Sequence, residues 1–169
     1  MADPDFYETD ILAWSEQQAE ALRELTRRRD LPNALDLAHV VEEIEDVGQS
    51  ELNAARSFVR LILRHAAKCL ADPETRSVLH WHVEIANWQS ELVDRVSPSM
   101  RHRIDLDVLW ARALRQAELD LLDQESDAEI IVRLRAFRGT SCPVSVDGIL
   151  ADPADPAALV ARMKRTPDE

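Results

Sequence analysis

Hydrophobic residues recur at helical spacing over residues 36–70, the longest periodic stretch of the chain. Apolar positions that repeat every three to four residues form a stripe along one face of a helix, so the pattern predicts one long helix. The stripe is broad, which indicates neighbours on more than one side. Its members are Leu37, Val40, Val41, Ile44, Val47, Leu52, Ala55, Phe58, Val59, Ile62, Ala66 and Cys69.

Shorter periodic segments before and after this stretch predict the partners of the long helix. Thr9 or Asp10 can cap a first helix that ends near residue 29, and Asp36 caps the long helix. A third helix is expected to begin at residues 72–74, where the sequence Asp-Pro-Glu combines a cap, a proline and a first-turn acid, and to end near residue 96. Gly48 lies inside the long helix and predicts a kink or a close crossing by another helix.

The last third of the chain predicts one more long helix and several short elements. Asp105 can cap a fourth helix that ends near residue 123, and a shorter helix follows at residues 128–137. Residues 139–155 are loop-like, with one turn at 146–150, and residues 157–164 form a final turn. The expected fold is all-α, a bundle of about four principal helices around one long central helix. We expect a single domain over residues 1–169 with frayed ends at 1–5 and 165–169.

Composition narrows the classes of function. The net charge of -12 argues against nucleic-acid binding and against docking on an anionic membrane surface. No apolar run is long enough to span a bilayer, and the acidic N-terminus lacks a signal-peptide pattern. The two cysteines, Cys69 and Cys142, have no metal-binding spacing, so we expect a reduced, cytoplasmic compartment. No phosphate-binding, dinucleotide-binding or hydrolase motif occurs, and no cofactor is predicted.

His39 and Glu43 are candidate metal ligands, because they lie four residues apart on one helical face. Helix bundles build metal sites from inward-facing Glu and His residues. Projected at 100 degrees per residue, however, the carboxylates around Glu43 point in different directions. The simpler interpretation is a solvated acidic segment, which the helix dipole favours near the start of a helix.

Polar residues within the apolar faces are the candidates for catalysis. Glu51 projects into the stripe, His65 lies at its margin, and His82 falls on the apolar face of the third helix. A buried carboxylate without a partner is costly, so Glu51 should meet a cation, a histidine or several donors. These residues predict either a polar pocket with acid–base chemistry or a buried pair that fixes helix register.

Charge is divided along the outer face of the long helix. Acidic residues occupy its first half and basic residues its second half, so two antiparallel copies would pair opposite charges. The dipole of any helix favours the same arrangement, which leaves a purely structural explanation open. The partner would be a second copy or another protein. The predicted interaction face comprises Glu42, Glu45, Asp46, Arg56, Arg60, Arg64 and Lys68.

Three stretches together resemble a known family: DFYETDILAW at 5–14, DLAHVVEEIEDVGQSE at 36–51 and CPVSVDGILADP at 142–153. Their order and separation are similar to those of the bacterial domain of unknown function 29 (DUF29). Arg64-His65, Lys68 and Trp81 also match positions where that family has H, K and W. The chain departs from the family at His39, where Asn is usual, and at Val144, where an aromatic residue is usual. The resemblance implies an all-helical bacterial protein and no particular activity.

The sequence is compatible with two classes of function. The first is a non-enzymatic module for protein–protein interaction or structural support, favoured by the divided surface charge. The second is a metal-dependent or acid–base enzyme, or a small-ligand binder, that uses Glu51, His65 and His82 in a pocket inside the bundle.

Overall fold

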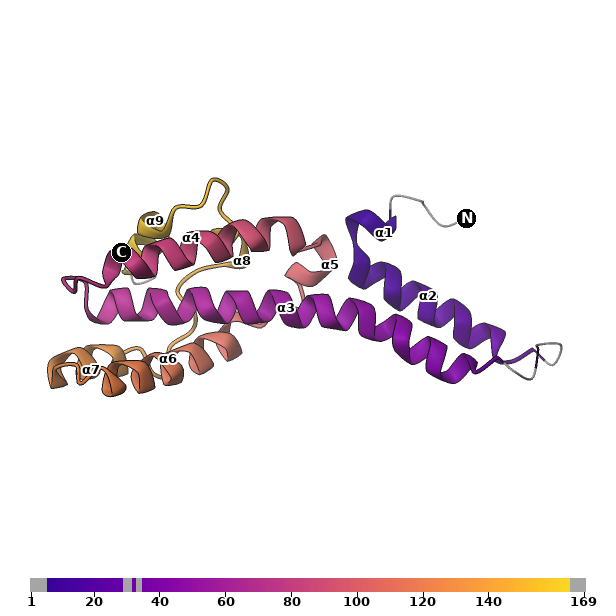
Figure 1. Ribbon diagram of the computed structural model, residues 1–169, viewed down its shortest axis with the longest axis horizontal. Coiled ribbons are helices and arrows are strands. Elements are labelled where there is room, and N and C mark those ends of the chain that lie inside the picture. The colour runs from indigo at the N-terminus through magenta and orange to yellow at the C-terminus, as the bar shows by residue number, and fades with distance from the viewer. Residues whose placement is uncertain (1–5, 29–31, 33–34, 165–169) are drawn as a thin grey trace. The chain divides into compact units, whose positions relative to one another are not determined.

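In the described residues, 6–28, 32 and 35–164, the computed structural model is helical and contains no strand. The four longest helices confirm the predicted bundle around a long central helix, which Figure 1 shows as α3. The predicted frayed ends lie outside the described residues. The helices are α1 (Phe6–Thr9), α2 (Ile11–Leu25), α3 (Leu37–Ala71), α4 (Val78–Arg95), α5 (Pro98–Arg101), α6 (Leu106–Asp123), α7 (Ala128–Arg135), α8 (Val146–Ile149) and α9 (Pro156–Lys164).

Contacts between residues divide the chain into two compact units. The first unit joins the described part of residues 1–55 to residues 96–103, and the second joins residues 56–95 to the described part of 104–169. Helix α3 contributes its first half to the first unit and its second half to the second. A single domain over the whole chain stays a prediction, and each unit is described separately below.

In the first unit, Asp10 organises the start of α2. Its Oδ1 accepts a hydrogen bond from the backbone N–H of Ala13 at 3.2 Å, which confirms the predicted cap. The same carboxylate accepts bonds from the hydroxyl of Ser97 at 2.8 Å and from the backbone N–H of Ser99 at 2.9 Å. Burial alone would raise the pKa of Asp10, but the hydrogen bonds from Ser99 and Ser97 lower it below its usual value.

Gly48 lies at a close contact between α2 and α3. A Cβ built on Gly48 would collide with the hydroxyl of Ser15 and lie 3.0 Å from the Cα of Leu12. Leu12, Ser15 and Gly48 are all buried. The predicted crossing at this glycine is therefore confirmed, because any larger residue would force the two helices apart.

In the second unit, α4 and α6 cover different sides of the second half of α3 (Figure 1). Residues 65–71 of α3 are all buried, so this part of the helix has no solvent-facing side. Helix α7 is held to α6 by buried Glu118, whose carboxylate accepts bonds from Arg135, at 2.8 Å from Nε, and from Arg138. Helix α9 packs against α4.

One detail of the sequence prediction was wrong. Helix α4 begins at Val78, whereas residues 72–77 form turns. The hydroxyl of Thr75 accepts from the backbone N–H of Ser77 at 3.5 Å, and the Thr75 carbonyl accepts from Val78 at 3.3 Å. This local bonding delays the helix past the Asp-Pro-Glu signal. The described residues just before α2 form the short helix α1.

No helix in the described ranges is long and apolar enough to cross a membrane.

Candidate functional site

A buried ionic cluster links α3 to α6 in the second unit. Asp120 of α6 accepts two hydrogen bonds from Arg64. One runs from Nε to Oδ2 at 2.5 Å, and the other runs from Nη2 to Oδ1. The amine of Lys68 lies 3.5 Å from Oδ2 of Asp120 and 4.8 Å from the centre of the Trp81 ring of α4. Lys68 is only 4% exposed. The lysine therefore lies between an acid on one helix and an aromatic face on another.

The charges in this cluster perturb one another. Burial alone would raise the pKa of Asp120, but the hydrogen bonds and charge of Arg64, together with Lys68, lower it below its usual value. Burial lowers the pKa of Lys68, and the charge of Arg64 lowers it further, although Asp120 opposes both effects. Asp120 therefore pairs with two cations, Arg64 and Lys68, and burial disfavours the charged form of Lys68.

His65, one of the predicted catalytic residues, is buried beside this cluster. Its Nδ1 lies 3.1 Å from the carbonyl oxygen of Leu61, and its Nε2 lies 3.8 Å from a carboxylate oxygen of Glu84. Its ring packs edge-to-face with that of Trp88, with the ring centres 4.8 Å apart. Burial and the charge of Lys68 lower the pKa of His65 to about 4. The imidazole is therefore neutral near pH 7, with Nδ1–H donating to the Leu61 carbonyl.

The other two predicted catalytic residues lie elsewhere. Glu51 is half-buried on the part of α3 that belongs to the first unit, whereas His82 is half-buried on α4 in the second unit. His65 meets α4 through Glu84 and Trp88. Gln89, on the same helix as His82, donates from Nε2 to the carbonyl of Ile149 at 2.8 Å. A catalytic role for Glu51, His65 and His82 remains a prediction.

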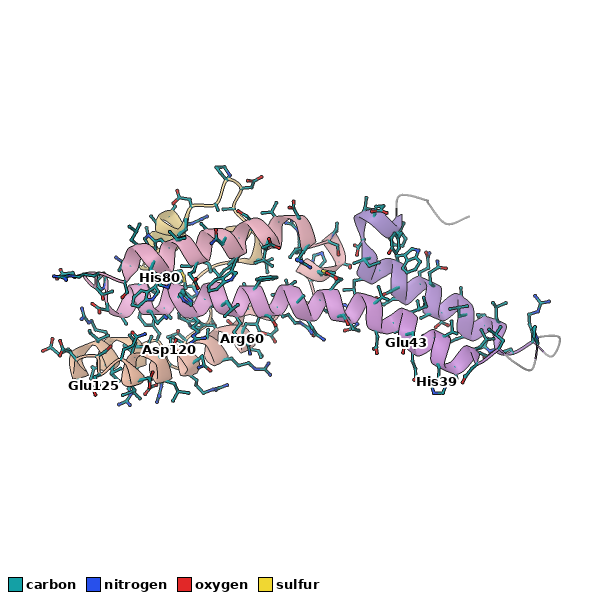
Figure 2. The ribbon with its side chains drawn as sticks, viewed as in Figure 1. His39, Glu43, Arg60, His80, Asp120 and Glu125 are labelled. Atoms are coloured by element: carbon teal, nitrogen blue, oxygen red, sulfur yellow. The ribbon has the colours of Figure 1, made fainter. Side chains whose placement is uncertain are left out.

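The predicted metal ligands lie on the exposed side of α3. His39 is bound through Nδ1 to Asp36 Oδ2 at 2.5 Å, and Asp36 Oδ1 also accepts from the backbone N–H of His39 at 3.3 Å. This hydrogen bond raises the pKa of His39. Figure 2 shows Glu43 one turn further along the same side. In the part of the chain that the structure describes, no group of three or more His, Cys, Asp or Glu side chains is placed to hold a metal.

Both cysteine thiols are weak nucleophiles at neutral pH. Burial raises the pKa of Cys69 and that of Cys142 to about 11. Because the thiolate is the reactive form, both side chains are overwhelmingly protonated under ordinary conditions.

The predicted interaction face is divided by the structure. Placing Lys68 on the outer face of α3 was wrong, because this residue is buried between α4 and α6. Arg64 is engaged by Asp120, and Glu45 pairs with Arg23 of α2 at 2.5 Å. Exposed positions remain at Glu42, Asp46 and Arg60, and Arg56 is half-buried.

Arg60 instead lines a groove between α3 and α6. We call this the arginine groove. Its volume is about 400 Å³, and it is lined by Arg60, Leu61, Arg64, Arg112, Arg115, Gln116 and Leu119. Arg60, Arg112 and Arg115 are exposed, and none of them pairs with a carboxylate among the described residues. The sequence prediction did not include Arg112 and Arg115. Their signal in the sequence is a lack of acidic neighbours: Arg112 has no acid three or four positions away, and the one such acid near Arg115, Glu118, pairs with Arg135 and Arg138 instead.

Comparison with solved structures identifies a similar protein. It is an alpha-helical protein of unknown function from Rhodospirillum rubrum ATCC 11170, whose crystal structure was determined at 1.45 Å resolution. The two chains share 39% sequence identity, and the match covers 92% of this chain and 96% of the other, with a TM-score of 0.82. No curated protein matches the chain.

The sequence profile of DUF29, a domain of unknown function, matches residues 6–152. This range contains α1 to α8 and every residue of the arginine groove and the buried ionic cluster. The expected resemblance is thereby confirmed over most of the chain, and the protein belongs to the DUF29 family.

Proposed function

We propose that the protein is a non-enzymatic interaction module that receives an acidic segment of a partner polypeptide in the arginine groove. The observation that carries the proposal is the group of three arginines without a paired acid, Arg60, Arg112 and Arg115, converging on one groove. The chain has 32 acidic residues against 20 lysines and arginines, so exposed cations have many potential partners within the molecule. Three arginines that line one groove without an acidic partner repel one another, and a bound anion would relieve that repulsion.

The lining of the groove favours a polypeptide as the anion. Leu61 and Leu119 add apolar surface next to the guanidinium groups, and Gln116 adds a neutral hydrogen-bonding side chain. An amphipathic acidic segment offers carboxylates for bidentate arginine bonds and apolar side chains for the leucines. The net charge of -12 works against a long polyanion such as a nucleic acid, because its phosphates extend beyond the groove over the rest of the acidic surface, whereas a short acidic segment can lie within the groove.

The chemistry of the candidate catalytic groups supports the same proposal. His65 has a pKa of about 4 and is held between the Leu61 carbonyl and the Trp88 ring, so it is poorly matched to proton transfer near pH 7. Arg64 and Lys68 are occupied by Asp120, which leaves the outer arginines as the groups available for an added ligand.

The test is fluorescence anisotropy with a labelled glutamate-rich helical peptide and its glutamine counterpart. We expect the acidic peptide to bind, and the double variant Arg112→Glu/Arg115→Glu to weaken binding by about tenfold or more, because attraction becomes repulsion. The matched control is Arg76→Glu/Arg133→Glu, which changes the net charge equally at two exposed arginines outside the groove. The control should bind like the wild type.

Two results would contradict the proposal. Equal weakening by both double variants would mean that only the overall charge matters. Tighter binding of a single-stranded oligonucleotide than of the acidic peptide, lost in the groove variant, would assign the groove to nucleic acid instead.

A further inference from the structure

The chain itself carries an acidic helical surface that suits the arginine groove. On the first half of α3, Glu42, Glu43 and Asp46 are exposed, and none of them forms an ion pair among the described residues. Their neighbour Glu45 differs, because Arg23 holds it at 2.5 Å. We call Glu42, Glu43 and Asp46 the acidic face. Three unpaired acids therefore lie on one helix, and three unpaired arginines line a groove elsewhere in the same molecule.

The spacing of the two sets is similar. Glu42 and Asp46 are four residues apart on α3, and Arg112 and Arg115 are three residues apart on α6. Each pair is therefore separated by about one helical turn, roughly 5–6 Å between Cβ atoms. Like charges at this spacing destabilise a helix. Bringing the acidic face to the arginine groove would relieve both repulsions at once.

Apolar side chains border both surfaces in the same way. Val40 and Val47, one on each side of the acidic residues in the sequence, are 37% and 41% exposed. Leu119 and Leu122, at the groove and one turn beyond it on α6, are 60% and 50% exposed. Protein interfaces commonly combine a small apolar centre with a polar rim. Each surface thus offers apolar side chains beside its charged ones.

We propose that the acidic segment received by the arginine groove is the acidic face of a second copy of this chain. In a two-fold symmetric pair, each copy presents its acidic face to its partner and receives the partner's face in its own groove. The contact then forms twice, and each contact brings acidic residues of one copy to arginines of the other. This inference rests on the proposed function, because it names the partner of the same groove.

Charge exchange between two variants tests this inference by sedimentation velocity at low salt. The groove variant is Arg112→Glu/Arg115→Glu, and the face variant is Glu42→Lys/Asp46→Lys. Each variant alone brings like charges together at both contacts, so each should be a monomer where the wild type is a dimer. An equimolar mixture should regain the dimer, because both contacts of the mixed pair join opposite charges. High salt should dissociate the wild-type dimer.

The control and the contrary outcomes separate this inference from the proposed function. The variant Arg76→Glu/Arg133→Glu should remain a dimer, and circular dichroism should show that all variants are folded. A monomeric wild type, or a mixture that stays monomeric, overturns the second-copy inference. If that monomer still binds the acidic peptide through its arginine groove, the proposed function stands without it. If the peptide is indifferent to reversal of the groove arginines, the proposed function itself fails.

Discussion

Replacing Asp120 by Asn should expose how strongly the buried ionic cluster holds α3 to α6. The amide keeps the size of the carboxylate but loses the charge that Arg64 and Lys68 share. Lys68 cannot regain water, because its side chain is 5% exposed, whereas that of Arg64 is 27% exposed and can turn outward. The variant therefore leaves one cation buried without its counter-ion.

The size of the effect follows from that burial. Removing one partner of a buried ion pair costs about 3–5 kcal/mol. Since one of the two cations is partly exposed, we expect the lower end, about 3 kcal/mol. For a chain of this length that loss should lower Tm by roughly 6–12 °C.

Urea unfolding followed by far-ultraviolet circular dichroism is the assay, and Asp123→Asn is the matched control. Asp123 is exposed on the same helix and forms no ion pair among the described residues, so its change should stay within about 0.5 kcal/mol. Lys68→Met gives a second contrast. Burial lowers the pKa of the Lys68 amine, which means that the fold disfavours its charged form. Lys68→Met should therefore lower the free energy of unfolding by about 1 kcal/mol at most, or raise it.

The pH dependence of the Asp120 effect has a defined sign. The folded pKa of Asp120 is lower than its unfolded value near 3.8, so its contribution is fully present above that pH. The contribution is lost as the pH falls through the lowered folded value. The difference between wild type and Asp120→Asn should therefore be constant near neutrality and shrink in strong acid. An Asp120→Asn protein as stable as the Asp123→Asn control would refute this reasoning.

Two further predictions concern single buried positions. Gly48→Ala should destabilise the protein by up to about 2 kcal/mol, because crowding against Leu12 and Ser15 costs about 1–3 kcal/mol, whereas alanine gains only roughly 1 kcal/mol in a helix; a gain in urea stability would contradict the close crossing. The pKa of His65 falls from 6.5 to about 4 on folding, so its contribution is present above pH 6.5 and roughly 3 kcal/mol is lost as the pH falls to 4. His65→Gln should lose less stability over that pH range, and an unchanged slope would show that His65 is not buried in its neutral form.

The sequence predicts the helices well because their signals are local. The Asp10 cap depends on residues three positions apart, and the stripe in α3 repeats every turn. Gly48 is also informative, because a glycine within a long helix otherwise costs stability and indicates a close neighbour. The start of α4 was misplaced because the bonding of Thr75 competes with the helix signal.

The candidate site was harder to predict because it depends on which helices lie side by side. Projection of α3 assigned Lys68 to an outer face, but residues 65–71 are covered on every side. Asp120, which holds Lys68, is more than fifty residues away, and no sequence spacing connects them. The arginine groove likewise requires Arg60 of α3 to meet Arg112 and Arg115 of α6. For Arg112 and Arg115 the sequence holds one local signal, which is that they are arginines without an available acidic neighbour on a predicted helix.

The most direct test of the arginine groove as the interaction surface is NMR of the arginine Nε–Hε groups during titration with the acidic peptide. The account predicts that the resonances of Arg60, Arg112 and Arg115 shift together as the peptide binds, while those of Arg76 and Arg133 stay in place. Equal shifts at all exposed arginines, or shifts confined to residues outside the groove, would contradict it.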